Sequence, residues 1–339
     1  MLEEALETEG ELVKRREFIT FLGSAAIWSP LIARAQPSKR RIVVLMPSSE
    51  DDADGRLLLT AFEQGLAQLG WGNGSNLRID FRWAIDNADK VKAVVAELQA
   101  NPPDIIVANT SRTVAALLRA TPTVPLVFAA IYEPVAQGFV QSLAHPGGNA
   151  TGFTAMEASI GAKWLQLLSE MAPGLARVAY MCNTNNPGPL QPYPAAETAG
   201  RDHRVTVALA DVHDATDIET AMTKLARQPG GGLIVPPDGF LVNHRKLIIE
   251  LAARNRLPAI YGLASFAVQG GLASYGVKLT AQFSQAAVYV DRILRGEKPA
   301  NLPVQEPTEY ALVINLKVAK TLGLKIPSMV LATADEVIE

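Results

Sequence analysis

RIVVLMPSSEDDADGRLLLTAFEQGLAQLG, residues 41–70, decides the fold class. Arg41–Met46 is an unbroken apolar run of the kind expected for a strand that is buried on both faces. After a polar loop, apolar side chains recur at helical spacing between Leu58 and Leu69, and Gly70 ends the pattern. A buried strand followed by a helix is the repeating unit of a parallel α/β sheet.

The same alternation continues along the chain. Further strands are expected at 77–83, 104–108, 125–129, 177–182, 205–209, 232–235, 258–261, 271–275 and 310–314. Helices are expected at 87–99, 113–120, 162–171, 194–202, 218–228, 244–255, 281–295 and 316–322. The turn-forming segment HPGGNATG (145–152) separates two α/β halves of about equal size, and we expect it to cross between domains.

Residues 1–35 form a predicted export leader. KRREFI (Lys14–Ile19) opens an apolar stretch that ends in an A-x-A cleavage pattern at 33–35, the layout of a signal peptide. The adjacent arginines make it similar to a twin-arginine signal over 13–35. The segment 1–12 is acidic where a leader is basic, so we expect translation to begin at Val13.

The composition excludes several classes of protein. The 339 residues suit two domains, and a hydrophobic fraction of 48% with 19% charged residues is that of a globular chain. A formal net charge of −3 without a basic cluster argues against a nucleic-acid partner. One cysteine, Cys182, allows no intramolecular disulfide, and the four histidines lack metal-ligand spacing. We therefore expect neither a metal nor a cofactor.

Motifs for the common α/β enzyme classes are also missing. The loop Pro47–Gly55 is acidic and has one glycine, so it does not suit a dinucleotide phosphate. The chain has no P-loop and no nucleophile elbow. Cys182 ends a predicted strand, where a small buried side chain is a better reading than a nucleophile. Gly230–Gly232 precedes a strand, which indicates a turn. We expect no enzymatic activity.

Four segments, in order, carry a resemblance to a known family. They are PLVFAAIYEPVAQGFVQSLAHPGGNATGF (125–153), RLPAIYGLASFAVQGGLASYG (256–276), AAVYVDRILRGEKPANLPVQEPTEYALVINLKVAKTLGL (286–324) and ADEVIE (334–339). Over residues 40–339 the chain resembles ABC-transporter substrate-binding proteins with the type I periplasmic binding fold. The better understood members of that family bind tryptophan and related aromatic amino acids.

The resemblance implies a fold class, a cellular location and binding partners. It implies two doubly wound parallel-sheet lobes with several crossovers between them. Lobe 1 is expected over 38–150 plus 277–300, and lobe 2 over 151–276 plus 301–339. A monomeric periplasmic protein that passes a small ligand to a membrane permease follows from the same likeness. An exported hydrolase-like enzyme and a ligand-sensing receptor are the alternatives.

Candidate ligand-binding residues follow the predicted strands, because parallel sheets bind ligands at the carboxyl ends of their strands. They are Ser48, Ser49, Asn109, Thr110, Ser111, Tyr132 and Glu133 in the first half, and Asn183, Thr184, Asp238, Phe240, Tyr261 and Tyr275 in the second. Helix capping at Thr110 and Ser111, ordinary loop chemistry and, for the tyrosines, core packing are the competing interpretations.

An amino-acid ligand would give these side chains distinct roles. Ser48, Thr110 and Ser111 would donate to a carboxylate, and Glu133 or Asp238 would accept from an ammonium. Tyr132, Phe240 or Tyr275 would line the side-chain pocket. Family members usually have Gly-Asp-Pro where this chain has Tyr-Glu-Pro at 132–134. The added ring favours a smaller amino acid or a small carboxylate over an aromatic one.

Overall fold

The computed structural model describes residues 39–83 and 87–339. The predicted leader, with its start at Val13 and its twin-arginine signal over 13–35, lies outside the described residues. Within the described chain, no helix has the length and apolar character that a membrane span requires.

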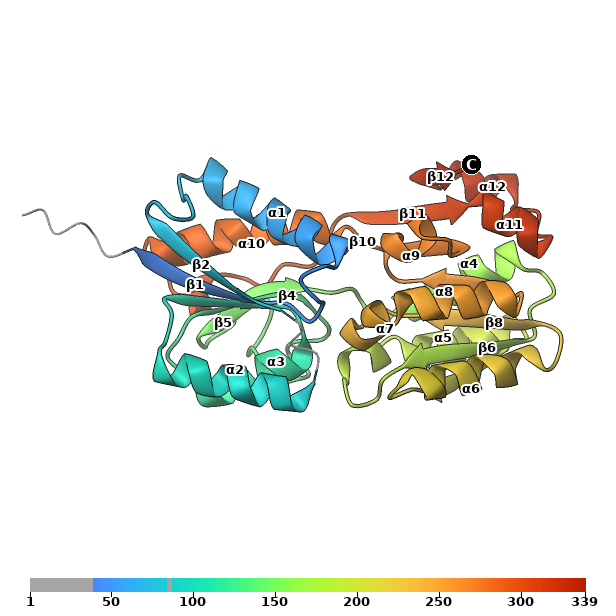
Figure 1. Ribbon diagram of the computed structural model, residues 1–339, viewed down its shortest axis with the longest axis horizontal. Coiled ribbons are helices and arrows are strands. Elements are labelled where there is room, and N and C mark those ends of the chain that lie inside the picture. Colours follow the sequence, from blue (N-terminus) through green and yellow to red (C-terminus); the bar gives the residue numbers. More distant parts are fainter. Residues whose placement is uncertain (1–38, 84–86) are drawn as a thin grey trace, which may run out of the picture. The chain divides into compact units, whose positions relative to one another are not determined.

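The first lobe is a five-stranded parallel sheet between two helical layers (Figure 1). The strand order is β2-β1-β3-β4-β5. The strands are β1 (Arg40–Leu45), β2 (Leu77–Arg82), β3 (Ile105–Ala108), β4 (Leu126–Ile131) and β5 (Ala150–Thr154). The helices are α1 (Ala53–Gln68), α2 (Ala88–Ala100), α3 (Ser111–Ala120) and α10 (Leu279–Leu294).

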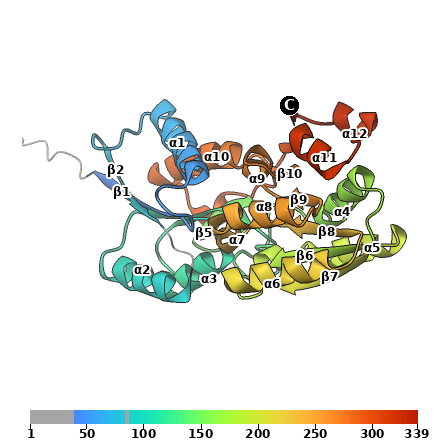
Figure 2. The same cartoon turned by 45° about the vertical axis from the view of Figure 1, so that its right-hand side comes forward.

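Alternate residues of β1 bury against different helices, since successive side chains of a strand point to opposite faces. Ile42 and Val44 pack in one core cluster with side chains of α1 and α10, whereas Val43 and Leu45 pack in another with side chains of α2 and α3. The helix α10 comes from far along the chain, yet it lies beside α1 in both views (Figures 1 and 2). Trp71 Nε1 donates to Asp291 of α10 at 2.7 Å, and this hydrogen bond holds α10 against the first lobe.

The second lobe contains a seven-stranded sheet in the order β12-β11-β10-β9-β8-β6-β7. The strands are β6 (Arg177–Cys182), β7 (Thr206–Asp211), β8 (Gly231–Val235), β9 (Ala259–Tyr261), β10 (Ala273–Val277), β11 (Tyr310–Asn315) and β12 (Glu336–Ile338). The helices are α4 (Ile160–Met171), α5 (Tyr193–Asp202), α6 (Ala215–Ala226), α7 (Gly239–Asn243), α8 (Arg245–Arg254), α9 (Ala264–Val268), α11 (Leu316–Leu322) and α12 (Ser328–Ala332). The short helix η1 (Gly188–Leu190) also belongs to this lobe, whereas η2 (Pro299–Asn301) packs against β5 of the first lobe.

Three segments of the described chain connect the lobes: the one after β5, the one between β10 and α10, and the one between η2 and β11. Two of them run together, because Thr154 N–H donates to the Gln305 carbonyl and Gln305 N–H donates to the Gly152 carbonyl, each at 2.9 Å. Several parallel connections of this kind form a hinge that allows the lobes to move while holding them in register.

The predicted fold class, two α/β lobes with parallel sheets, is confirmed, with two local differences. The pair β10–β11 is antiparallel, because β11 enters from the hinge at the opposite end of the sheet. The segment predicted as a turn-rich crossing contains β5, which extends the first sheet to Thr154, beyond the expected boundary at residue 150. Gly152 explains why β5 resembles a loop in sequence. A Cβ at this position would lie 1.9 Å from the Phe128 carbonyl oxygen, so the close pairing with β4 requires glycine.

Candidate ligand-binding site

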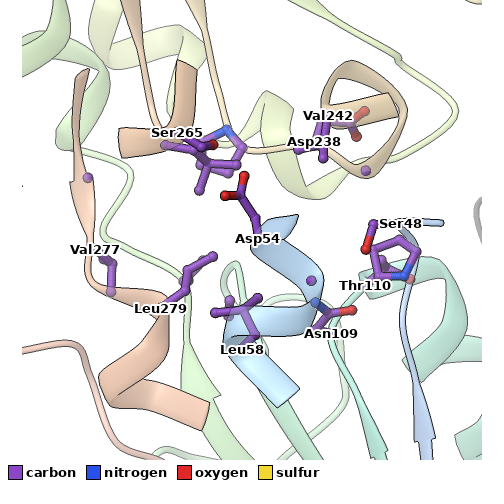
Figure 3. A pocket seen from close by; sticks show the side chains of 18 of the residues that line it. Ser48, Asp54, Leu58, Asn109, Thr110, Asp238, Val242, Ser265, Val277 and Leu279 are labelled. Carbon is purple, nitrogen blue, oxygen red and sulfur yellow. The ribbon is translucent and has the colours of Figure 1, made fainter. Parts of the chain in front are cut away.

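A cavity of about 310 Å³ lies between the two lobes (Figure 3). First-lobe residues that follow β1, β3 and β4, together with the start of α1, form one side of it. Second-lobe residues around η1 and after β8, β9 and β10 form the other side. Its position at the carboxyl ends of parallel strands is the usual ligand site of such sheets.

Polar groups gather at one end of this cavity. In Figure 3, Ser48, Asn109 and Thr110 lie together at the side where Asp238 faces them. Thr110 caps α3 by accepting from the Thr113 N–H at 3.3 Å. The neighbouring Ser111 hydroxyl accepts from Gln137 Nε2 at 3.1 Å, which leaves its own proton available. Hydroxyl donors at a helix N-terminus favour an anionic group.

Asp238 is the buried acidic group at this end and is 7% exposed. Its carboxylate accepts from Asn186 Nδ2 at 2.8 Å and, as the cap of α7, from the Leu241 N–H at 3.1 Å. Burial raises the pKa of the Asp238 carboxyl above its ordinary value, because desolvation outweighs these hydrogen bonds. An additional cationic donor from a ligand would stabilise the ionised form.

Three buried polar atoms in the lining have no hydrogen-bond partner within the described chain: Asn109 Oδ1, Asn186 Oδ1 and the Tyr132 hydroxyl. Buried polar groups are almost always paired in folded proteins. Three such atoms around one cavity therefore indicate a site for a hydrogen-bonding ligand.

The other end of the cavity is mainly apolar, and Asp54 and Ser265 lie between the two ends. Val277 and Leu279 lie there in Figure 3, and Leu58 lies between Leu279 and Asn109. Leu57 also lines the cavity and is 59% exposed, which places an opening to solvent near the start of α1. The cavity thus suits a ligand with a polar head and an apolar body.

The family model described as ABC transporter substrate binding protein matches residues 41–338. The chain belongs to this family. It is a substrate-binding protein of an ABC transporter, and the interlobe cavity is its candidate site.

Relatives with known structures or names agree with this membership. A tyrosine-binding protein of Clostridioides difficile is 24% identical over 264 residues, which are 78% of this chain and 76% of the relative. An ABC domain from Streptococcus pneumonia, solved with L-Trp, superposes with a TM-score of 0.81 at 24% identity and covers 89% of this chain and all of the other. A conserved domain protein of Vibrio cholerae has the same TM-score at 25% identity, covering 88% of this chain and 99% of the other.

Of the residues expected to bind ligand, the structure brings six to the cavity of this substrate-binding protein: Ser48, Asn109, Thr110, Ser111, Tyr132 and Asp238. Tyr132 follows β4 of the first lobe but packs in a second-lobe core cluster. A Cβ at Gly188 of η1 would lie 3.1 Å from its ring, so Tyr132 also bridges the lobes. Asn183 and Phe240 line a small adjoining pocket of about 30 Å³ that shares Thr110 and Asp238 with the cavity.

Five candidates stand outside both linings. Ser49 is exposed, and Glu133 lies in the turn after β4 with a positive φ of 40°. The Thr184 hydroxyl donates to the Asp211 carboxylate at 2.8 Å. Tyr261 stacks on Phe266 in the second-lobe core, with ring centroids 4.8 Å apart, and Tyr275 stacks on Tyr310 at 5.8 Å. For both tyrosines, packing against a neighbouring ring accounts for the aromatic side chain at that position.

Several lining residues escaped sequence reasoning. Asn186 lies two positions after the expected residues Asn183 and Thr184, and its Nδ2 donates to the Asp238 carboxylate at 2.8 Å. Asp52 and Asp54, at the start of α1, line the cavity from a loop that the sequence marked only as unsuited to phosphate. The helix-start pattern of an aspartate before Gly55 could have located Asp52, which accepts from the Gly55 N–H at 2.9 Å.

Proposed function

We propose that this substrate-binding protein captures a free α-amino acid with a large apolar side chain and delivers it to the permease of an ABC importer. The observation that supports the proposal is the division of the interlobe cavity into a polar and an apolar end. The ligands named for the relatives from Clostridioides difficile and Streptococcus pneumonia, tyrosine and L-Trp, belong to this class.

The ligand carboxylate is assigned to the N-terminus of α3. Ser48 and Ser111 supply hydroxyl protons there, and Thr110 stands at the cap position. The partial positive charge of a helix N-terminus stabilises an anion. The ligand ammonium is assigned to Asp238, with Asn109 Oδ1 and Asn186 Oδ1 as the further acceptors that lack partners within the described chain. Asp238 replaces Glu133 in this role, since only Asp238 lines the cavity.

The side chain of the ligand is assigned to the apolar end, among Leu58, Val277 and Leu279. Aliphatic side chains stabilise a bound aromatic ring or branched aliphatic chain by removing its apolar surface from water. The Tyr132 ring, which raised the expectation of a smaller ligand, packs against the second-lobe core and leaves a cavity of about 310 Å³. That volume is within the usual range for small-molecule sites, roughly 300–1,000 Å³.

The proposal includes export and the absence of catalysis. The leader over 13–35 would send the chain through the twin-arginine route, and the mature protein would act as a periplasmic monomer beside its permease. Ligand binding by two lobes around a hinge requires no covalent chemistry.

Calorimetric titration of the mature protein from Gln36 with a panel of amino acids tests the proposal. L-tyrosine, L-tryptophan and L-leucine should bind, while glycine and L-glutamate should bind far more weakly, because they leave the apolar end empty or place a charge in it. Bound ligand recovered after prolonged incubation should be chemically unchanged. Tight binding of a sugar or polyol, with no amino acid bound, would refute the assignment, and turnover of the ligand would refute the non-catalytic role.

A further inference from the structure

Arg245 connects the two lobes at the edge of the cavity. It lies at the start of α8 in the second lobe and is 8% exposed. One guanidinium nitrogen donates to Asp52 of the first lobe at 2.9 Å, and the other donates to Asp54. Both aspartates line the cavity, whereas Arg245 is not part of its lining.

The second lobe also holds the guanidinium through contacts of its own. Its Nε donates to Gln269 Oε1 at 3.0 Å, and Nη1 donates to the Ser265 hydroxyl at 3.2 Å. The guanidinium carbon lies 5.8 Å from the centre of the Phe266 ring. A charge fixed in this way loses little further entropy when the carboxylates of the first lobe approach it.

Arg245 also affects the charge that the cavity presents to a ligand. The acidic and basic side chains in the lining are Asp52, Asp54, Asp238 and Lys278. Lys278 is exposed and pairs with Glu309 at 3.9 Å. At the start of α1, Arg245 is therefore the cation in direct contact with two carboxylates that would otherwise face the ligand as a doubly negative surface.

We propose that Arg245 is a specificity-determining residue: by pairing with Asp52 and Asp54 across the cleft, it prevents the closed cavity from attracting cationic ligands. The pairing forms between lobes, so it is made on closure, when the ligand is enclosed. A zwitterionic ligand then meets one acidic side chain, Asp238, instead of three. This inference rests on the proposed amino-acid site, but its test does not require that any amino acid binds.

The test measures the charge preference of the cavity with two probes. Agmatine, a guanidinium amine without a carboxylate, is titrated into the wild type and into Arg245→Gln, and L-tyrosine is titrated into both. In the variant the two carboxylates lose their cation, so agmatine should bind at least about tenfold more tightly than to the wild type. L-tyrosine should bind more weakly, because its carboxylate is repelled. Arg254→Gln removes an exposed arginine from the same helix and should change neither affinity.

The reciprocal variant reverses the sign of the effect. Asp52→Asn combined with Asp54→Asn leaves the guanidinium without its carboxylates, so phenylacetate should gain affinity and agmatine should not. This second variant also serves if Arg245→Gln fails to fold, which circular dichroism reveals. Arg245→Lys retains the positive charge and should exclude agmatine as the wild type does.

The outcomes separate this inference from the proposed function. A wild type that binds no amino acid contradicts the proposed function, while a gain of agmatine binding in Arg245→Gln still supports the role of Arg245. Weaker binding of L-tyrosine in that variant without any gain of agmatine binding would show that Arg245 only holds the lobes together, and the inference would be overturned. Unchanged phenylacetate affinity in the double variant Asp52→Asn with Asp54→Asn would overturn it as well.

Discussion

Asp238 combines the ligand role proposed for it with a cost to stability. The raised pKa of its buried carboxyl means that the folded protein holds the proton more readily than the unfolded chain does. The protonated carboxyl therefore contributes stability that is present below the unfolded pKa, near 3.8, and is lost as the pH rises through the folded pKa. When it is ionised, the group is a desolvated charge that the fold must accommodate.

For this reason we expect Asp238→Asn to leave the melting temperature at pH 7 unchanged or higher. The new side chain still accepts from the Leu241 N–H, and the amide of Asn186 can turn its unpartnered Oδ1 toward the new donor. The variant should bind L-tyrosine about 10- to 100-fold more weakly, the usual effect of losing a charged hydrogen bond. Melting curves and titrations at pH 7 measure both effects.

A matched control is Asp214→Asn, because Asp214 caps the exposed start of α6 through the Asp217 N–H at 2.8 Å. That variant should leave the affinity for L-tyrosine unchanged. As the pH is lowered toward 4, the difference in melting temperature between Asp238→Asn and the wild type should shrink. A large loss of stability in Asp238→Asn at pH 7 would mean that the carboxylate holds the lobe together.

Two helices of the first lobe begin with the same kind of cap but face different surroundings. Thr110 caps α3 at the cavity, and Asn87 caps α2 by accepting from the Lys90 N–H at 3.0 Å, away from the cavity lining. We expect Thr110→Ala and Asn87→Ala each to lower the free energy of unfolding by about 1 kcal/mol. Of the two variants, only Thr110→Ala should also lower the affinity for L-tyrosine, because α3 and not α2 has its N-terminus at the cavity.

Chemical denaturation and titration of both variants measure these quantities. If the two variants lose stability equally and both keep full affinity, the assignment of the ligand carboxylate to α3 is wrong. The comparison removes the general effect of a lost cap, since both helices lie on the same face of one sheet (Figure 1).

Motion between the lobes can be followed with labels, because the native cysteine does not interfere. Cys182 is fully buried, and burial raises the pKa of its thiol to about 12, so it should not react with a maleimide or thiosulfonate label at pH 7. Lys92→Cys in α2 and Thr223→Cys in α6 place one exposed label on each lobe. L-tyrosine should narrow their distance distribution, measured by pulsed electron paramagnetic resonance, to a single population.

The control pair is Lys92→Cys with Thr60→Cys, two exposed sites of the first lobe whose distance should not respond to the ligand. Adding Arg245→Gln to the interlobe pair should broaden the distribution, since the ion pairs between lobes are lost. An interlobe distance that is the same with and without L-tyrosine would contradict closure around the ligand.

Local patterns were enough to predict the two lobes and part of the site. Arg41–Met46 had to be a buried strand, because its run of apolar side chains leaves no face for water. Once the strands are parallel, their carboxyl ends share one edge, so Ser48, Thr110 and Asp238 could be placed near a common cleft before their contacts were known. The family segments added the order in which the chain returns between lobes.

The remaining features depend on contacts between distant parts of the chain. Asp52 and Asp54 meet Arg245 about 190 positions later, a distance at which no periodic pattern connects them. Tyr132 lines the cavity, but its ring also packs into the opposite lobe, and Tyr261 had the signature of a cleft residue but fills a core. Spacing along a sequence reports which face of its own element a side chain occupies. Which other element covers that face is set by packing, and only the tertiary structure decides it.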